Sequence, residues 1–345
     1  MLFVGKNILE FTIGDGKIAI TFYAICILLG AIIAYKLSQF FLKKKGFDPN
    51  AIETLFYVAF AAGIIGARIW WVIAENEPFE NFYKIWEGGL AIQGGVLVGG
   101  LVGIVFMIKR RPNIPVLLAT DCIVPNILVA QAIGRWGNFF NQEVYGKCVD
   151  RWTFLPSFIT DRLSIALNST GNDWATSNWT GDLYLGANNY YYLCEGGADQ
   201  MVLPLFLIEG FINLCGFFIL TFGIPALFKF INKKCKVISL ANGDLMCGYL
   251  IFYGIARAIL EPLRNEKFIM GVENGQGNAQ SIMMSILFII LGIIGIIFCH
   301  LYDRFWKKKK ILETNVITGS EADKDAVSIA ELMKDSQKNE EDESK

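Results

Sequence analysis

The chain has 345 residues, a formal net charge of −1 and one histidine. Its hydrophobic fraction of 54% and mean hydropathy of +0.43 exclude an ordinary soluble domain of this size. The near-zero net charge says nothing about a nucleic-acid partner, but the sequence has no basic patch interleaved with aromatics, so none is expected. With one histidine and eight scattered cysteines that lack Cys-x-x-Cys spacing, the sequence predicts neither a metal site nor a cofactor.

Seven apolar segments are long enough to cross a bilayer, since a transmembrane helix needs about 20 apolar residues. They lie at 18–37, 51–73, 90–108, 115–133, 203–223, 245–262 and 281–301. We therefore predict an all-α polytopic membrane protein with about seven transmembrane helices embedded in a lipid bilayer.

The charge of the connecting loops alternates along the chain. Lysines and arginines gather at 43–45, 109–111, 229–236 and 304–310, whereas the loop at 74–88 carries Glu75, Glu77, Glu80 and Glu87 against a single lysine. The positive-inside rule then places the C-terminus in the cytoplasm. Because the number of spans is odd, the N-terminus is expected outside.

The same topology divides the chain into regions. Residues 1–306 form a transmembrane domain, and a small extracytoplasmic head is inserted at about 147–202, between the fourth and fifth spans. Cys148 and Cys194 flank this head and are candidates for a disulfide, which sequence alone does not decide. Residues 307–345 are charged and lack aromatics, which predicts a disordered cytoplasmic tail.

An unusual polar segment, GRWGNFFNQEVYG, follows the fourth span at 134–146. It brings Arg135, Asn138, Asn141 and Glu143 to the outer membrane boundary. A charge at membrane depth costs roughly 2.5–3.5 kcal/mol on insertion scales unless it has a partner or a task. One interpretation is an interfacial cap, in which Arg135 snorkels and the asparagines bond to helix-end carbonyls. Four polar groups interleaved with aromatics favour a binding site instead.

The sixth span carries a second polar array. Tyr253, Arg257 and Glu261 are spaced by four residues and therefore share one helical stripe, with Arg264 three residues further on. Pro262 cannot donate to the helix ladder and should kink or end the helix there. An Arg–Glu pair that only fixes helix packing is the structural alternative, but an intramembrane charge indicates a functional site by default.

A glycine-rich turn at 88–95 leads into the third span. Small residues of this kind mostly allow close helix packing. Gln93, a lone amide beside Gly94, is the exception. The remaining polar residues within or bordering spans are Tyr23, Arg68, Asp121 and Glu209. Glu209 is placed to orient an arginine, Arg68 and Asp121 equally fit buried structural partners, and Tyr23 also fits an interface aromatic.

We expect all these groups in the outer half of the membrane. Arg135 and Arg257, with Arg264 as a third candidate, suit an anionic phosphate because a guanidinium binds two of its oxygens at once. The carboxylates are able to orient these arginines or to accept a proton. The pattern indicates recognition of a phospholipid headgroup, with cationic stabilisation of a phosphate leaving group.

The segment 134–146 resembles the signature of the bacterial prolipoprotein diacylglyceryl transferases, Gly-Arg-x-Gly/Ala-Asn-Phe-apolar-Asn-x-Glu-x-x-Gly, at every fixed position. The array at 253–264 resembles the family's second polar helix, and 88–95 resembles its glycine-rich turn. The resemblance spans roughly residues 15–300. It implies an enzyme of the bacterial plasma membrane that moves the diacylglyceryl group of phosphatidylglycerol to the lipobox cysteine of an exported prolipoprotein. This first step of lipoprotein maturation forms a thioether and releases glycerol phosphate.

The resemblance also implies roles for individual residues. It assigns catalysis to Arg135, Arg257, Glu143, Glu261 and Tyr253. Substrate binding is expected of Arg135, Asn138, Asn141, Gly94, Tyr23, Glu209 and Arg264, and also of Gln93 through its amide.

The chain departs from the family at the histidine that has been proposed as the base. Gln93 stands in that place, Leu203 stands before Pro204 where relatives often have histidine, and His300 is expected at the cytoplasmic end. Glutamine is not basic near neutral pH. Glu143 or Glu261 would accept the thiol proton, or the arginines would stabilise the thiolate, which is the interpretation we favour.

A different class of function also fits the polar residues. It is a non-catalytic transporter or lipid-binding protein for an anionic phospholipid. Transporters often contain internal repeats with paired broken helices, and the two arginine motifs here differ in sequence and position.

Overall fold

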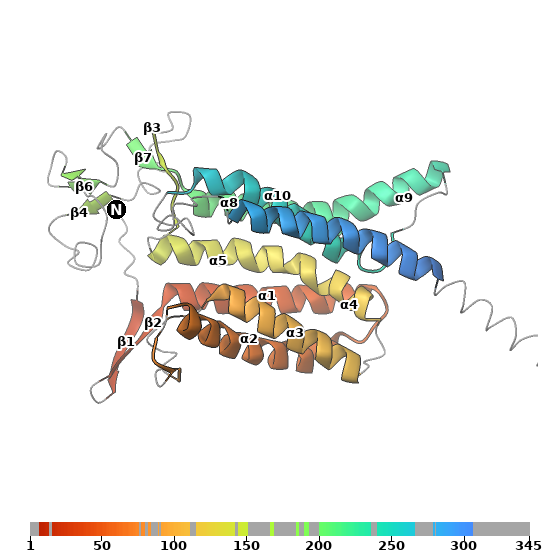
Figure 1. Ribbon diagram of the computed structural model, residues 1–345, viewed down its shortest axis with the longest axis horizontal. Helices are drawn as coiled ribbons and strands as arrows, with labels where there is room; N and C mark the ends of the chain where they lie inside the picture. The colour runs from red at the N-terminus through yellow and green to blue at the C-terminus, as the bar shows by residue number, and fades with distance from the viewer. Residues whose placement is uncertain are drawn as a thin grey trace, which may run out of the picture.

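The computed structural model describes residues 7–13, 16–75, 77–79, 82–83, 89, 91–110, 115–141, 144–150, 166–168, 184–185, 190–192, 200–235, 240–265, 279 and 281–305. Long apolar helices lie side by side in one bundle (Figure 1). They are α1 (Phe22–Lys44), α2 (Glu53–Ala74), α3 (Ile92–Arg110), α4 (Val116–Ile123), α5 (Ile127–Asn141), α8 (Leu205–Phe218), α9 (Ile224–Cys235), α10 (Asp244–Leu260) and a final helix, Ser281–Phe305. Short helical turns join them at η1 (Pro49–Ile52), η4 (Val124–Asn126), η7 (Ile219–Gly223) and η8 (Glu261–Leu263).

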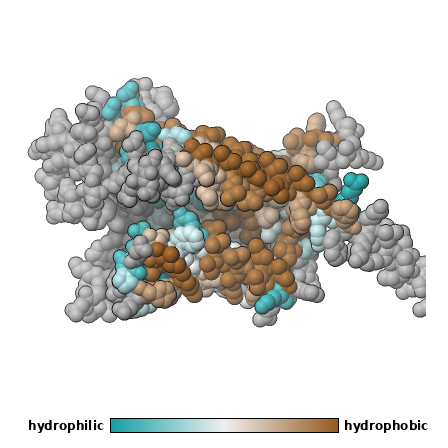
Figure 2. Space-filling view, viewed as in Figure 1, coloured by the Kyte–Doolittle hydropathy of each residue, from teal (hydrophilic) through white to brown (hydrophobic). Residues whose placement is uncertain are grey.

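Six helical segments of the described chain are long and apolar enough to cross a membrane, and a shorter apolar helix lies at Gln93–Lys109. The prediction of a mainly helical, multi-pass membrane protein is therefore confirmed. Figure 2 shows apolar side chains covering much of the face of the bundle that is in view. Val96, Leu101 and Ile104 of α3 are exposed, as are Ile290 and Ile294 of the final helix, as expected of surfaces that face lipid.

The boundaries of the first and fourth spans differ from the prediction. The first helix begins at Phe22 rather than at 18, because residues 16–21 form a strand and Thr21 caps the helix by accepting from Ala24 N at 3.2 Å. The fourth span is α4, η4 and α5 together, and it continues to Asn141 instead of ending at 133. Arg135 and Asn138 therefore lie on the last two turns of α5, inside the helix rather than after it.

Short strands supplement the helices, which the sequence did not predict. β1 (Asn7–Ile13) and β2 (Gly16–Thr21) form an antiparallel hairpin. β3 (Cys148–Asp150) pairs with β7 (Gln200–Val202), and β4 (Ala166–Asn168) and β5 (Tyr184–Leu185) flank β6 (Tyr190–Tyr192). The pair β3–β7 brackets the predicted head insertion, and the strands lie at one end of the bundle (Figure 1), called here the strand end.

The opposite end of the bundle carries the described lysines at 43–45, 109 and 229–233 and is called here the basic end. Leu42, Ile52, Met107 and Ala119 form a buried apolar cluster there, next to residues 43–45 and 109. Asp121 also lies there: its carboxylate accepts from Gly243 N at 2.7 Å and Met246 N at 2.9 Å, at the start of α10. The expectation that Asp121 shares the outer half with the other polar groups is wrong, because a carboxylate at a helix N-terminus satisfies its free amides.

Close backbone contacts hold the helices together. Gly94 of α3 lies directly on the Gly66 carbonyl of α2, and a methyl group at either position would collide with the other helix. On α10, Gly254 faces Ser285 O of the final helix in the same way. The apolar neighbours Leu203, Leu205 and Leu260 then pack α8 against the end of α10, which fixes the positions of their polar residues at the strand end.

Candidate active site

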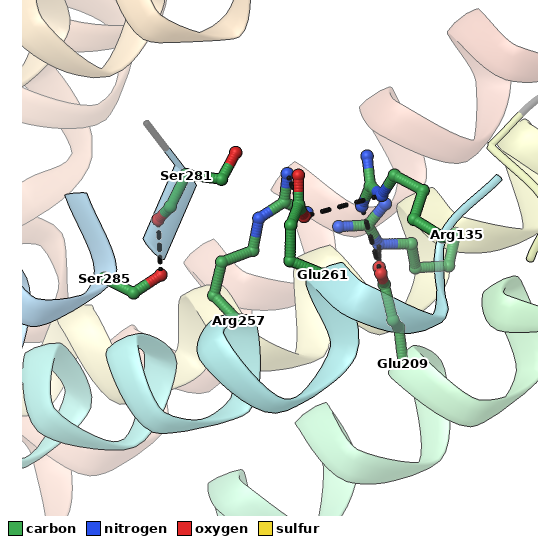
Figure 3. A network of polar contacts seen from close by, with 7 residues as sticks. Arg135, Glu209, Arg257, Glu261, Ser281 and Ser285 are labelled. Atoms are coloured by element: carbon green, nitrogen blue, oxygen red, sulfur yellow. Dashed lines mark hydrogen bonds and ion pairs between the residues drawn. The ribbon is translucent and has the colours of Figure 1, made fainter. Parts of the chain in front are cut away.

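Three arginines and two glutamates from three parts of the chain meet at the strand end of the bundle (Figure 3). Arg135 comes from α5 and Glu209 from α8, whereas Arg257, Glu261 and Arg264 come from the end of α10 and η8. These five residues are called here the arginine–carboxylate cluster. Its members come from the two polar motifs and the fifth span, so the sequence motifs that looked separate form one site.

Glu209 holds one arginine on each carboxylate oxygen. Its Oε2 lies 2.6 Å from Arg135 Nε, and its Oε1 accepts a hydrogen bond from Arg264 Nη2 at 3.2 Å. The side chain is 6% exposed. Its two arginine partners compensate the charge that burial of this carboxylate would otherwise leave unpaired. The contact between Glu209 and an arginine is the one that its position in the sequence predicted.

Glu261 is the second carboxylate of the cluster. Its Oε2 lies 3.0 Å from Arg257 Nη2, one helical turn earlier, and 3.6 Å from Arg264 Nε. Its other oxygen, Oε1, is buried and has no hydrogen-bond partner among the described residues. The helix ends at Leu260 and turns through η8 at Pro262, as predicted, and this turn brings Arg264 back toward Glu261.

Arg264 bridges the two carboxylates, because it contacts both Glu209 and Glu261. Its side chain is 8% exposed, whereas those of Arg135 and Arg257 are 22% and 21% exposed. Burial lowers the pKa of Arg264 below its usual range, and the two carboxylates partly offset that effect. An arginine starts so far above neutral pH that it stays charged. Three cations against two anions leave one net positive charge, which matches a phosphodiester anion.

Backbone contacts join the end of the 134–146 segment to Arg264. Gly146 forms an isolated antiparallel bridge with Arg264, Lys147 N donates to Leu263 O at 3.0 Å, and Asn265 N donates to Tyr145 O at 3.2 Å. A Cβ at Gly146 would lie 2.6 Å from Leu203 Cβ and 2.9 Å from Leu263 O. The last glycine of the segment is therefore required by close packing, which sequence reasoning missed.

The other predicted site residues on these helices lie around the cluster. Tyr253 is one turn before Arg257 and stacks on Tyr249 at 6.0 Å between ring centroids. The ring of Tyr23 packs against Gly137 of α5, two residues after Arg135. Asn138 is half-buried one turn after Arg135. Glu143 and the side chain of Asn141 lie outside the described residues.

The glycine-rich turn is held by Arg68 of α2. This buried arginine donates to Phe82 O and to Gly89 O, both at 3.1 Å, and lies over the Trp71 ring at 4.7 Å. Gly89 has φ of +70°, which suits a residue without a side chain. Arg68 is thus a structural partner, one of the two roles that the sequence left open. Gln93 is exposed on the first turn of α3, and Gly94 is buried against Gly66.

Neither a histidine nor a metal cluster lies at this site among the described residues. His300 lies at the basic end, where its Nε2 is 3.1 Å from Asp244 Oδ2. The described chain contains no group of three or more His, Cys, Asp or Glu side chains that could hold a metal ion. The hydroxyl of Ser285, also drawn in Figure 3, donates to Ser281 O at 2.8 Å, a hydrogen bond within its own helix.

Fold and site define a multi-pass membrane protein with a buried arginine–carboxylate cluster suited to an anionic substrate. Residues 10–298 match the family model described as prolipoprotein diacylglyceryl transferase. The chain is 34% identical over 287 residues to the phosphatidylglycerol–prolipoprotein diacylglyceryl transferase of Streptococcus pyogenes serotype M3. The aligned region covers 82% of this chain and 92% of the relative. Serotypes M5 and M49 have similar proteins with the same values. The chain belongs to the prolipoprotein diacylglyceryl transferase family.

Proposed function

We propose that this protein transfers the diacylglyceryl group of phosphatidylglycerol to the cysteine thiol of a prolipoprotein lipobox. Family membership supports the reaction, and the arginine–carboxylate cluster is the observation that carries its chemistry. Arg135 and Arg257 are the two arginines of the cluster with partly exposed side chains. They are therefore the groups that bind the lipid phosphate.

The reaction forms a carbon–sulfur bond at the glyceryl carbon that carries the phosphate ester. The sulfur attacks as a thiolate, the carbon–oxygen bond breaks, and its electron pair leaves with the phosphate of glycerol phosphate. Negative charge grows on the phosphate oxygen as that bond breaks. Arg135 and Arg257 stabilise this charge, since preorganised cations contribute most where charge develops.

The carboxylates and Arg264 hold these two arginines in place. Glu209 fixes Arg135 through Nε, and Glu261 fixes Arg257 through one Nη2 contact, so other guanidinium nitrogens remain to bind substrate. Arg264 is the least exposed of the three and contacts both carboxylates. We assign it a positioning role in preference to direct substrate contact.

The thiol proton must leave before or during attack. Of the two carboxylates in the cluster, Glu209 has an arginine on each oxygen, whereas both arginine contacts of Glu261 are to Oε2 and leave Oε1 without one among the described residues. Glu261 is therefore the better placed of the two to accept this proton. The nearby arginines lower the free energy of the thiolate and so weaken the demand on any base.

Two independent features support an orientation with the strand end outside a bacterial plasma membrane. The lysine-rich segments, including 43–45 and 229–233, lie at the opposite end, and positive residues favour the cytoplasmic side. Cys148 of β3, at the strand end, is disulfide-bonded, and disulfides persist in oxidising compartments. Cys194 and the tail from 307 lie outside the described residues.

The test is transfer by purified protein from phosphatidylglycerol labelled in its diacylglyceryl part to a lipobox peptide. The expected product is a peptide that is heavier by one diacylglyceryl group. Its new thioether bond should survive reagents that cleave thioesters. A lipobox peptide with serine for cysteine should gain no label. If lipid moves across vesicles without any thioether product, the transporter class is correct and the proposal fails.

A further inference from the structure

The helical run that begins with α8 is too long for the membrane. It continues without a break through η7 and α9 over 29 residues, Leu205–Lys233. At 1.5 Å per residue it measures roughly 44 Å, against a hydrocarbon core of about 30 Å. The π-helical turn η7 and Pro225 lie between α8 and α9. Both are features at which helices change direction. The sequence alone predicted a span at 203–223 and, after it, only a basic loop.

The level of α9 along the bundle is fixed by its neighbours. Leu220 packs in one cluster with Leu128 and Phe217, and the ring of Phe222 lies 6.0 Å from that of Phe41. Phe41 is two residues before the lysines at 43–45. The first residue of α9, Ile224, is therefore already close to the polar boundary of the basic end.

Although α9 lies at this boundary, one of its faces is strongly apolar. Leu227, Phe230 and Ile231 are 54%, 64% and 36% exposed, at the three- and four-residue spacing of a single helix face. Lys229 and Lys233, also spaced by four, are exposed on the other side. Figure 1 shows α9 leaning away from the rest of the bundle.

We propose that α9 is an interfacial helix that lies on the membrane surface at the basic end and binds anionic phospholipid headgroups. Leu227, Phe230 and Ile231 enter the boundary between headgroups and acyl chains. Lys229 and Lys233 contact the phosphates above them. Helices with this pattern of apolar and basic faces bind in the plane of the interface. The proposal concerns a surface far from the arginine–carboxylate cluster and does not depend on the transfer reaction.

The length of the helical run and the charge of α9 together favour an anionic membrane surface over water or the hydrocarbon core. A helix that projected into water would expose two large aliphatic side chains and a phenylalanine, at a cost that burial in the interface removes. A helix that continued through the hydrocarbon would bring Lys229 and Lys233 into it. Each lysine near an anionic surface contributes about 1 kcal/mol to the free energy of binding, which is equivalent to roughly a fivefold preference for that surface over a zwitterionic one.

Photo-crosslinking of the full-length protein in vesicles tests this directly. Phe230 is replaced by the photoreactive residue p-benzoylphenylalanine, and the vesicles contain phosphatidylserine and phosphatidylcholine, so that the probe lipid is not the substrate. We expect lipid adducts in which phosphatidylserine is enriched several-fold over its share of the bilayer. The combined change K229Q/K233Q should remove that enrichment while adducts persist.

Two control positions separate the possible outcomes. The probe at Phe218, an exposed residue in the middle of the span, should give lipid adducts without enrichment in either background. The probe at Lys233 should give fewer lipid adducts than the probe at Phe230. Adducts to another protein at Phe230, equal adducts at 230 and 233, or enrichment that survives K229Q/K233Q would each overturn the proposal.

Discussion

Glu209 joins arginines from two distant motifs: its Oε1 lies 3.2 Å from Arg264 Nη2, and its Oε2 lies 2.6 Å from Arg135 Nε. The carboxylate thereby fixes the distance between the 134–146 segment and the end of α10. Two arginines that would otherwise repel each other are held together without a substrate. The site is thus preorganised for an anion.

Replacing Glu209 with glutamine should disable the site. Losing one partner of a buried ion pair costs about 3–5 kcal/mol, because the remaining charge is uncompensated. We expect the transfer rate to fall at least about 100-fold, with most of the loss in kcat because the arginines are misplaced. Glu209→Asp, which keeps the charge, should recover part of it. Transfer by Glu209→Gln at the wild-type rate would contradict the positioning role.

Arg135 and Arg257 should each be needed for the chemical step. Removing one preorganised donor from a site of developing charge lowers the catalytic rate by a factor of about 10²–10³. Arg135→Ala and Arg257→Ala are expected to show that loss in a labelled-lipid transfer assay, and the lysine variants to remain impaired because lysine cannot bind bidentately. Gln93→Ala, at an exposed amide, should have a milder effect and serves as the comparison.

The pH dependence of Glu261→Gln distinguishes a proton acceptor from a counter-ion. A free cysteine has a pKa of about 8.5, so more of the acceptor peptide is thiolate as pH rises past that value. If Glu261 accepts the proton, the rate loss of Glu261→Gln should shrink between pH 7 and pH 9. A loss of constant size across this range would leave Glu261 only the role of holding Arg257.

Gly146→Ala should destabilise the protein through packing alone. The added methyl group would collide with Leu203 and Leu263 O, and overpacking of this kind costs about 1–3 kcal/mol. The expected result is a lower unfolding temperature in detergent. Gly100→Ala is a matched control, since a Cβ there meets nothing within 4 Å and alanine favours the helix. Equal unfolding temperatures for the two variants would refute the packing argument.

Arg68→Met should loosen the glycine-rich turn. The change removes the donors to the Phe82 and Gly89 carbonyls, and each buried acceptor left unsatisfied costs about 1–3 kcal/mol. Protease cleavage near the turn should accelerate, and Arg68→Lys should restore only part of the protection. Unchanged cleavage in both variants would show that the turn is held by other contacts.

Much of this architecture follows from local sequence. Hydropathy located the helices, and the four-residue spacing placed Arg257 and Glu261 on one helical stripe, where they form an ion pair. The hydropathy-based prediction also ended the fourth span too early. Hydropathy counts Arg135 as an isolated charge and contains no information about its ion pair with Glu209. Asp121 was assigned to the wrong end for a related reason: its partners are backbone amides of α10, more than a hundred residues away. The substrate-binding role of Asn141 and the catalytic role of Glu143 stay predictions.

The bridge between Gly146 and Arg264 has a mechanical consequence. The same stretch of backbone begins β3 and, through Leu203 N on Lys147 O at 3.0 Å, is tied to the segment that leads into α8. The base of the head insertion, the start of the helix that carries Glu209 and the backbone of Arg264 are therefore fastened at one junction. Pulling on the head would shift both ends of the Glu209–Arg264 contact together, so the spacing of the charges survives movements of the domain above them.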